Sequence, residues 1–243
     1  MRVVAIIQAR MGSTRLPGKV LMDIAGETML ARVVNRVRRA TRIDETVVAT
    51  TVSQKDEPIV AECQKLNVTY FRGSEEDVLD RYYQAAHTHN AEVVVRITSD
   101  CPLIDPEVVD QVVEEFATEE ADYACNGLAQ TYPRGLDVEV MTLHALERAW
   151  READKPYQRV HVTPYIYEIP GRFCVHSVES GENHSDHRWT VDTPEDLAFV
   201  KEIYRLFEGV DSFSWRDVLE VLKREPELMG INHHVRQKEL EEG

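Results

Sequence analysis

Short apolar runs alternate with amphipathic stretches in the N-terminal part of the chain. The apolar runs have the length of buried strands: 3–7 (VVAII), 46–51 (TVVATT) and 93–97 (VVVRI). Apolar residues recur at helical spacing in the stretches between and before them: 28–40, 55–66 and 77–89. This alternation predicts right-handed βαβ units and a mostly parallel sheet flanked by helices. In such α/β folds, ligands bind beyond the carboxyl ends of the strands.

The pattern changes in the middle of the chain. Residues 135–141 (GLDVEVM) alternate between polar and apolar, and 172–179 (RFCVHSVE) have the composition of another strand. Turn-forming Pro-Arg-Gly and Pro-Gly sequences precede both segments. These features predict that 126–180 is a β-rich insertion, which would cover the site or form a dimer contact.

Two helices are predicted near the C-terminus, at 194–207 and 214–224. Thr193 and Pro194 supply an N-terminal cap and a first-turn proline for the earlier one. The tail from Arg236 is charged and is expected to be frayed. The whole chain, 1–243, has the length of a single α/β domain.

Composition excludes several classes of protein. The formal net charge of −15 argues against nucleic acid as a partner, since DNA binding needs a positive face. No apolar run is long enough for a transmembrane helix, and the first strand runs directly into Arg10, unlike a secretory signal. A cytoplasmic location is therefore expected, with the four widely spaced cysteines reduced. The arginines at 32, 36, 38, 39 and 42 are interpreted as a solvated helix face.

The segment 8–19 (QARMGSTRLPGK) directly follows the first strand and has the composition of an anion-binding loop. Glycines let backbone N–H groups turn toward an anion, hydroxyls add donors, and the cations supply positive charge. The residues concerned are Ala9, Arg10, Gly12, Ser13, Thr14, Arg15 and Lys19. The spacing does not fit a P-loop, because five residues separate Gly12 from Gly18 and valine follows Lys19. The alternative is a solvated basic turn.

Five segments resemble motifs of the CMP-sugar synthetases, the family of the Kdo and acylneuraminate cytidylyltransferases. They are QARMGSTRLPGKVL, RGSEEDVLDRYYQAA, VVRITSDCPLIDP, YPRGLDVEV and HRWTVDTPEDL, and they are most similar to the spore-coat polysaccharide (SpsF) branch. The resemblance implies a Rossmann-like nucleotide-diphospho-sugar transferase fold, CTP as donor and a homodimer. It also implies that Arg10, Ser13, Arg15 and Lys19 clasp the triphosphate.

Two aspartates are expected at strand ends. Asp100 follows VVVRITS, and Asp192 follows HRWTV. Carboxylates beside a triphosphate suit Mg²⁺, which needs only one or two of them. The resemblance implies this metal role for both. The alternative reading of each is a helix cap.

The acceptor is expected near YPRGLDVEV. Asp137 and Glu139 face the same way on a strand. Three readings stay open: recognition of sugar hydroxyls with Arg134 pairing a carboxylate, a DxD-like metal site, and a solvent-facing strand edge. His161 and Arg188 are further candidates for the acceptor site. Arg81 is a candidate for nucleotide contact or else a salt-bridged helix residue.

The sequence thus predicts a nucleotidyltransferase that joins CMP from CTP to a small acidic sugar and releases pyrophosphate, with Arg10, Lys19 and Asp100 as catalytic residues. A sugar-nucleotide-dependent glycosyltransferase and a non-catalytic nucleotide-binding protein remain as alternatives. The identity of the acceptor stays open, because Ser99-Asp100-Cys101 departs from the corresponding Kdo-enzyme segment.

Overall fold

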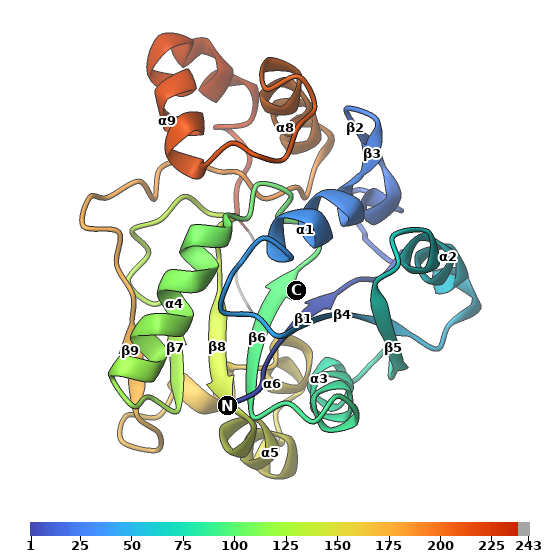
Figure 1. Cartoon of the computed structure of the whole chain (residues 1–243), viewed down its shortest axis with the longest axis vertical. Coiled ribbons are helices and arrows are strands. Elements are labelled where there is room, and N and C mark those ends of the chain that lie inside the picture. The colour runs from blue at the N-terminus through green and yellow to red at the C-terminus, as the bar shows by residue number, and fades with distance from the viewer. Residues whose placement is uncertain (238–243) are drawn as a thin grey trace.

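A seven-stranded sheet forms the centre of the molecule in the computed structural model, which describes residues 1–237 (Figure 1). The strand order is β5-β4-β1-β6-β8-β7-β9, and β8 alone runs antiparallel to its two neighbours. The mostly parallel α/β sheet predicted from the apolar runs is confirmed. The charged tail predicted from Arg236 lies mainly outside the described residues.

The strands of this sheet are short, and the central ones are mostly apolar. Their bounds are β1 Val3–Gln8, β4 Glu45–Thr51, β5 Thr69–Gly73, β6 Val93–Thr98, β7 Tyr123–Cys125, β8 Glu139–Thr142 and β9 Val175–Ser177. A separate two-stranded hairpin pairs β2 (Asp23–Ile24) with β3 (Glu27–Thr28). The predicted strands 3–7, 46–51 and 93–97 therefore coincide with β1, β4 and β6, which are adjacent in the sheet.

Helices cover both faces of the sheet, and each face has its own apolar core. Alternate residues of β1 divide between the cores: Ala5 and Ile7 enter one, while Val4 and Ile6 enter the other. Burial on both faces explains why the central strands are mostly apolar. The helices of the first core are α1 Met29–Val37, α2 Glu57–Lys65, α4 Pro106–Thr118, α8 Pro194–Leu206 and α9 Trp215–Arg224. Those of the second are α3 Val78–Thr88, α5 Leu143–Glu152 and α7 Pro164–Tyr167, and α6 (Pro156–His161) lies against α3.

The prediction that 126–180 is a β-rich insertion is wrong. Most of its regular structure is helical, comprising α5, α6 and α7, and its two strands, β8 and β9, belong to the main sheet. The alternation in 135–141 reflects side chains that face a cavity and the core, and only its last part is strand. The polar–apolar alternation of this segment indicates strands, whereas the spacing of Leu143, Leu146 and Ala149 indicates the helix α5 that the structure shows.

The C-terminal helices α8 and α9 and the 3-10 helix η3 (Pro226–Ile231) form a group above the carboxyl end of the sheet (Figure 1). Arg32 and Arg36 of α1 attach this group. They are 2% and 0% exposed, and they donate to the carbonyls of Gly209, Asp211 and Phe213. The interpretation of this arginine stretch as a solvated helix face is therefore wrong for these two residues.

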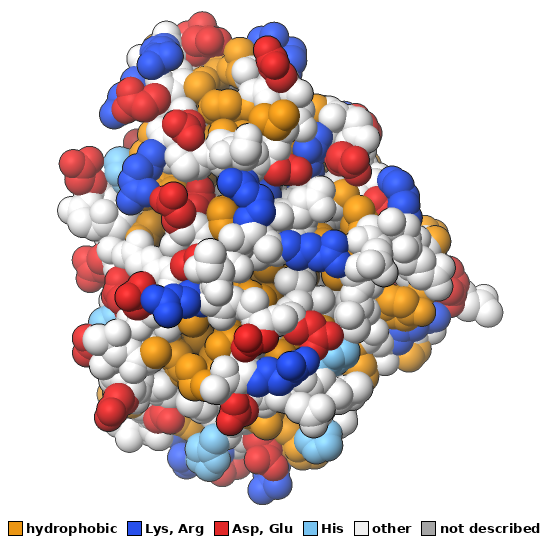
Figure 2. Space-filling view, in the orientation of Figure 1, with side chains coloured by type: hydrophobic (Ala, Val, Ile, Leu, Met, Phe, Trp, Pro, Cys, Tyr) orange, Lys and Arg blue, Asp and Glu red, His pale blue; other side chains and the backbone are white. Residues whose placement is uncertain are grey.

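Acidic and basic side chains are interspersed over the face seen in Figure 2, so the charge of −15 does not form one field there. Among the described residues, no helix combines the length and apolar character that crossing a membrane requires.

Candidate active site

The anion-binding loop connects β1 to the short 3-10 helix η1 (Lys19–Leu21) and is folded around the backbone of Met11. The carbonyl of Met11 accepts hydrogen bonds from the amides of Ser13 at 2.9 Å and Gly18 at 3.1 Å. Gly18 adopts φ +71°, a left-handed conformation that favours glycine. The loop thus closes on itself and brings Lys19 to the carboxyl end of the sheet.

A buried carboxylate fixes this loop from outside. Asp56, the last residue of the 3-10 helix η2 (Gln54–Asp56), is 3% exposed, and its Oδ1 accepts from the amide of Met11 at 2.8 Å. Its other oxygen accepts from the hydroxyl of Thr51 at the end of β4. Sequence reasoning missed Asp56, since an aspartate before a helix is ordinarily read as a cap.

Lys19 brings Asp100 and Asp192 together. Its Nζ lies 2.9 Å from Oδ2 of Asp100, 2.9 Å from Oδ1 of Asp192 and 2.7 Å from the carbonyl oxygen of Val191. Burial disfavours the charge of Lys19, but the two carboxylates outweigh it and raise its pKa. Burial likewise raises the pKa of Asp100, but the nearby Lys19 ammonium outweighs that effect and holds the pKa below its usual value.

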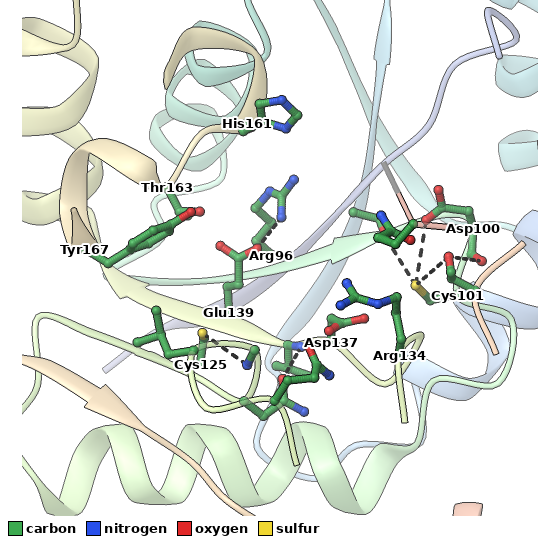
Figure 3. Close-up of a pocket in the computed structure, with 18 of the residues that line it drawn as sticks. Arg96, Asp100, Cys101, Cys125, Arg134, Asp137, Glu139, His161, Thr163 and Tyr167 are labelled. Atoms are coloured by element: carbon green, nitrogen blue, oxygen red, sulfur yellow. Dashed lines mark hydrogen bonds and ion pairs between the residues drawn. The ribbon is translucent and has the colours of Figure 1, made fainter. Parts of the chain in front are cut away.

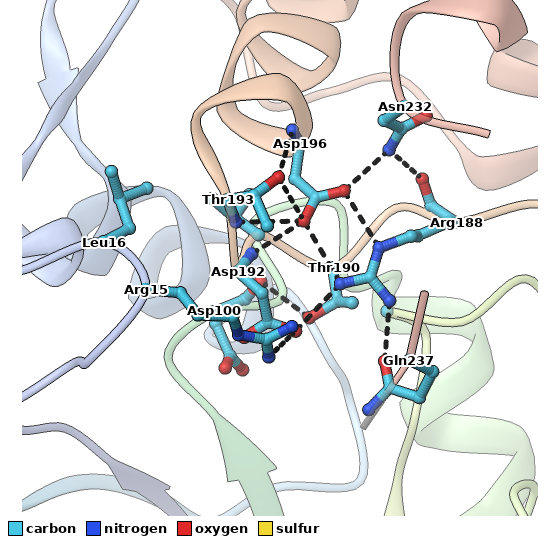
Figure 4. Close-up of polar contacts among 12 residues, drawn as sticks. Arg15, Leu16, Asp100, Arg188, Thr190, Asp192, Thr193, Asp196, Asn232 and Gln237 are labelled. Carbon is cyan, nitrogen blue, oxygen red and sulfur yellow. Dashed lines mark hydrogen bonds and ion pairs between the residues drawn. The ribbon is translucent and has the colours of Figure 1, made fainter. Parts of the chain in front are cut away.

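Two arginines contact the other oxygen of Asp192. Arg15 and Arg188 each place Nη2 2.9 Å from Oδ2 (Figure 4). Arg188 also binds both oxygens of Asp196 and donates to Oε1 of Gln237 at 2.6 Å. Asp192 is thus surrounded by three cations from two separate segments, the anion-binding loop and the segment that precedes α8. It does not cap α8; Thr193 does, in a capping box with Asp196.

The two aspartates fit a Mg²⁺ site. One ammonium group contacts an oxygen of each, so both carboxylates converge on a position that a cation already occupies. Mg²⁺ characteristically takes one or two carboxylates and completes its shell with water and phosphate oxygens. Within 1–237, no group of three or more histidine, cysteine or acidic residues is arranged to hold a metal without such help. Their metal role stays a prediction.

A cavity of about 460 Å³, here called the loop cavity, opens beside the anion-binding loop. It is lined by all nine residues predicted to contact the nucleotide: Ala9, Arg10, Gly12, Ser13, Thr14, Arg15, Lys19, Arg81 and Asp100. Arg81 is 1% exposed and donates to the carbonyl of Ser74. Burial and the nearby Arg10 lower its pKa. No ion pair holds Arg81 within the described part of the chain, which disagrees with the salt-bridged reading.

A second cavity of about 640 Å³, here called the strand cavity, lies over β8 and the start of α7 (Figure 3). Four of the five predicted acceptor residues line it: Arg134, Asp137, Glu139 and His161. The fifth, Arg188, lines a smaller neighbouring cavity, and its guanidinium is committed to Asp192 and Asp196. The structure therefore does not place Arg188 with the other four.

The two acids of the Asp-Val-Glu segment have different surroundings. Oδ2 of Asp137 accepts from the amide of Gly135 at 2.7 Å, and burial raises its pKa. Glu139 accepts from Arg96 with one oxygen and from the hydroxyl of Tyr123 at 3.1 Å with the other. The strand-edge reading is wrong, because β8 lies between β6 and β7. A metal pair is disfavoured, since both oxygens of Glu139 have partners.

The loop and strand cavities meet along a shared wall. Six residues line both: Arg15, Arg96, Thr98, Asp100, His161 and Asp192. Arg96 and Thr98 were not predicted. A charge inside the apolar run VVVRI is the signal that could have identified Arg96, because parallel strands buried on both faces rarely carry one.

The chain is similar in sequence to known proteins. A family model described as "Cytidylyltransferase" matches residues 4–218. An uncharacterized protein of Methanocaldococcus jannaschii is 39% identical, across 100% of this chain and 99% of that protein. The spore coat polysaccharide biosynthesis protein SpsF of Bacillus subtilis is 33% identical, across 93% and 95%. A 3-deoxy-manno-octulosonate cytidylyltransferase of Solibacter usitatus is 29% identical, across 84% and 95%.

Solved structures have the same fold. A cytidylyltransferase from Leptospira borgpetersenii superposes with a TM-score of 0.91 at 34% identity, over 98% of this chain and 100% of that one. A CMP:2-keto-3-deoxy-manno-octonic acid synthetase solved with CTP gives a TM-score of 0.66 at 19% identity, over 85% and 100%. At that identity, the second similarity concerns the fold alone.

Proposed function

Because the chain belongs to the cytidylyltransferase family and is a nucleotidyltransferase, we propose that it transfers CMP from CTP to an acidic sugar and releases pyrophosphate, with Mg²⁺. One observation carries this proposal: Lys19 gathers Asp100 and Asp192 at the wall shared by the loop and strand cavities. A donor in one cavity and an acceptor in the other would meet at this position.

The loop cavity suits the triphosphate. Arg10, Arg15 and Lys19 provide charge, and the backbone around Gly12 and Ser13 provides N–H donors. These cations are concentrated at one site of an otherwise acidic protein, so the local field there attracts a polyanion although the net charge does not.

In the proposed reaction, an acceptor hydroxyl oxygen bonds to the α-phosphorus of CTP. The bond from that phosphorus to the β-phosphate oxygen breaks, the hydroxyl proton is released, and pyrophosphate leaves. Held by Asp100 and Asp192, Mg²⁺ would supply neutralisation of the phosphate oxygens. The residues around it position the two reactants and exclude water from the shared wall.

The strand cavity suits a sugar with one carboxylate. The guanidinium of Arg134 makes no hydrogen bond or ion pair with another described residue, and it lies near Asp137 in the cavity wall (Figure 3). An uncommitted arginine can pair with a carboxylate through two parallel hydrogen bonds. The relatives that act on 3-deoxy-manno-octulosonate use such a sugar acid, which supports the same class of acceptor here.

A screen of pyrophosphate release tests the proposal. Each of the four nucleoside triphosphates is combined with a panel of 2-keto-3-deoxy sugar acids, and the products are identified by mass spectrometry. We expect release with CTP and at least one sugar acid, with a CMP-sugar as the second product. Release of free nucleotide from a sugar nucleotide would indicate a glycosyltransferase instead, and CTP binding without turnover for every acceptor would contradict an enzymatic role.

A further inference from the structure

A buried ion pair lies across two central strands, between the loop and strand cavities. Arg96 of β6 and Glu139 of β8 are directly opposite in the register, and their side chains are 12% and 17% exposed. Nη1 of Arg96 donates to Oε1 of Glu139. Burial alone would lower the pKa of Arg96, but Glu139 outweighs it and the pKa is raised. The guanidinium of Arg96 therefore carries its charge at neutral pH.

Stability does not explain this pair. The next positions on the same face of the two strands are apolar: Val94 and Met141, which are paired in the register, are both 0% exposed. A buried ion pair is often no more stable than apolar residues of similar volume, because both charges must leave water. In addition, Nε of Arg96 is buried with no hydrogen-bond partner among the described residues. An incompletely satisfied charge at the centre of a sheet indicates a role in the adjoining site.

Arg96 lies between the cavities proposed for the two reactants. It lines the loop cavity and the strand cavity, whereas Glu139 lines only the second. Nη2 of Arg96 donates to Oε1 of Gln8 at 3.2 Å, and Gln8 is the last residue of β1, where the anion-binding loop begins. The guanidinium thus has one edge fixed by a carboxylate and the other held only by a neutral amide, which an anion can displace.

We propose that this pair joins the two halves of the site, with Arg96 contacting the phosphate group that is transferred and Glu139 accepting a hydrogen bond from an acceptor hydroxyl. The proposal rests on the function proposed above. Arg96 keeps its proton throughout and stabilises charge on the α-phosphate oxygens. Glu139 holds the guanidinium at the shared wall and leaves part of its own carboxylate facing the strand cavity.

Removing both charges separates this role from a structural one. Arg96→Leu leaves Glu139 buried without its partner, so its Tm should fall below that of the wild type. The double variant Arg96→Leu, Glu139→Leu should recover the Tm, because neither charge remains. Its rate of CMP transfer should nevertheless stay about 100-fold below the wild type. Recovery of the rate together with the Tm would overturn the proposal.

A second variant keeps the proposal testable if the double variant does not fold. Glu139→Gln is nearly isosteric, and we expect it to raise the KM for the acceptor about tenfold while the KM for CTP changes little. An unchanged acceptor KM would overturn the assignment of Glu139. If the wild type transfers CMP to no acceptor, the proposed function fails; an active wild type with an equally active double variant refutes only the role of this pair.

Discussion

The ammonium nitrogen of Lys19 lies 2.9 Å from Oδ2 of Asp100, a residue 81 positions later in the chain. The same nitrogen reaches Asp192, so it contacts both carboxylates proposed to bind metal. A cation between two acids compensates their mutual repulsion in this buried place. The lysine therefore keeps the two acids together.

Replacement of Lys19 by methionine should destabilise the protein in a pH-dependent manner. In the wild type, the lysine lowers the pKa of Asp100, so the interaction stabilises the fold above the unfolded pKa of about 3.9 and is lost as the pH falls through the lower folded value. In Lys19→Met, burial is opposed only by the hydrogen bonds that Thr98 and the backbone make to the Asp100 carboxylate, so the pKa of Asp100 should be higher than in the wild type and acid should narrow the difference in stability between the two proteins. The gap in Tm should be widest at neutral pH and should narrow toward pH 4 (about the unfolded pKa).

Thermal melts of both proteins across this pH range measure the effect. Added Mg²⁺ should raise the Tm of Lys19→Met more than that of the wild type, since the metal can take the position between the carboxylates. A gap in Tm that is independent of both pH and Mg²⁺ would contradict this description of the cluster.

Loss of the carboxylate at Asp56 should weaken nucleotide binding from a distance. Asp56→Ala removes the acceptor that fixes the amide of Met11, and the anion-binding loop loses its external anchor. We expect the KM for CTP to rise about tenfold or more. Asp110→Ala is the matched control, because Asp110 also accepts from backbone amides, at Thr41 and Arg42, on another part of the surface. An equal KM for CTP in the two variants would contradict the role of Asp56 as an anchor of the loop.

Arg134 should determine affinity for the acceptor and not for the nucleotide. Arg134→Ala removes a charge-assisted hydrogen-bonding group of about 1.5–3 kcal/mol, so the acceptor KM should rise roughly 10- to 100-fold at an unchanged KM for CTP. Steady-state kinetics with each substrate varied in turn provides the measurement. Arg216→Ala, at an arginine that is 63% exposed in its side chain, should leave both constants unchanged. A larger rise in the KM for CTP than in the KM for the acceptor would contradict the assignment of Arg134 to the acceptor site.

A close backbone approach at Gly135 should make this position intolerant of a side chain. Gly135 has φ +109°, and a Cβ there would lie 2.5 Å from the amide nitrogen of Thr190 and 2.7 Å from the carbonyl carbon of Trp189. Gly135→Ala should therefore reduce the free energy of unfolding by about 3 kcal/mol, measured by urea denaturation. Gly181→Ala is the control for the cost of a positive φ alone, since Gly181 has φ +79° with open space around it. Similar losses in the two variants would show that the contact with Trp189 and Thr190 is unimportant.

The sequence was most informative where local pattern and fold agree. Residues 3–7 are apolar throughout, and 46–51 and 93–97 are mostly apolar, because both faces of these strands are buried; this pattern is visible without coordinates. Much of the loop cavity was also predictable, because Arg10, Arg15 and Lys19 lie with Gly12 in one continuous segment. In 126–180, the sequence pattern predicted part of the strands but none of the helices. The alternation around Asp137 suggested a strand, but it arises because side chains there line a cavity, and β8 begins only at Glu139.

Residues that act through distant partners could not be read from local pattern. Asp56 contacts Met11 across 45 positions, and Arg96 pairs with Glu139 across 43. Each residue has an ordinary local interpretation, as a helix cap or as a strand charge. Only the sheet order, which places β6 between β1 and β8, makes Arg96 a neighbour of both Gln8 and Glu139.

The rate of pyrophosphate release by Asp100→Asn tests the central claim most directly. The amide keeps the shape of the side chain and removes the charge proposed to hold Mg²⁺, so the rate at saturating CTP, acceptor and Mg²⁺ should fall at least about 100-fold, equivalent to roughly 2.7 kcal/mol. Because Lys19 keeps Asp192 as its partner, the Tm should fall less than in Lys19→Met and the variant should stay folded at the assay temperature, with Asp110→Asn as the control for loss of an acidic residue. A variant that folds normally and retains more than about a tenth of the wild-type rate would contradict the account.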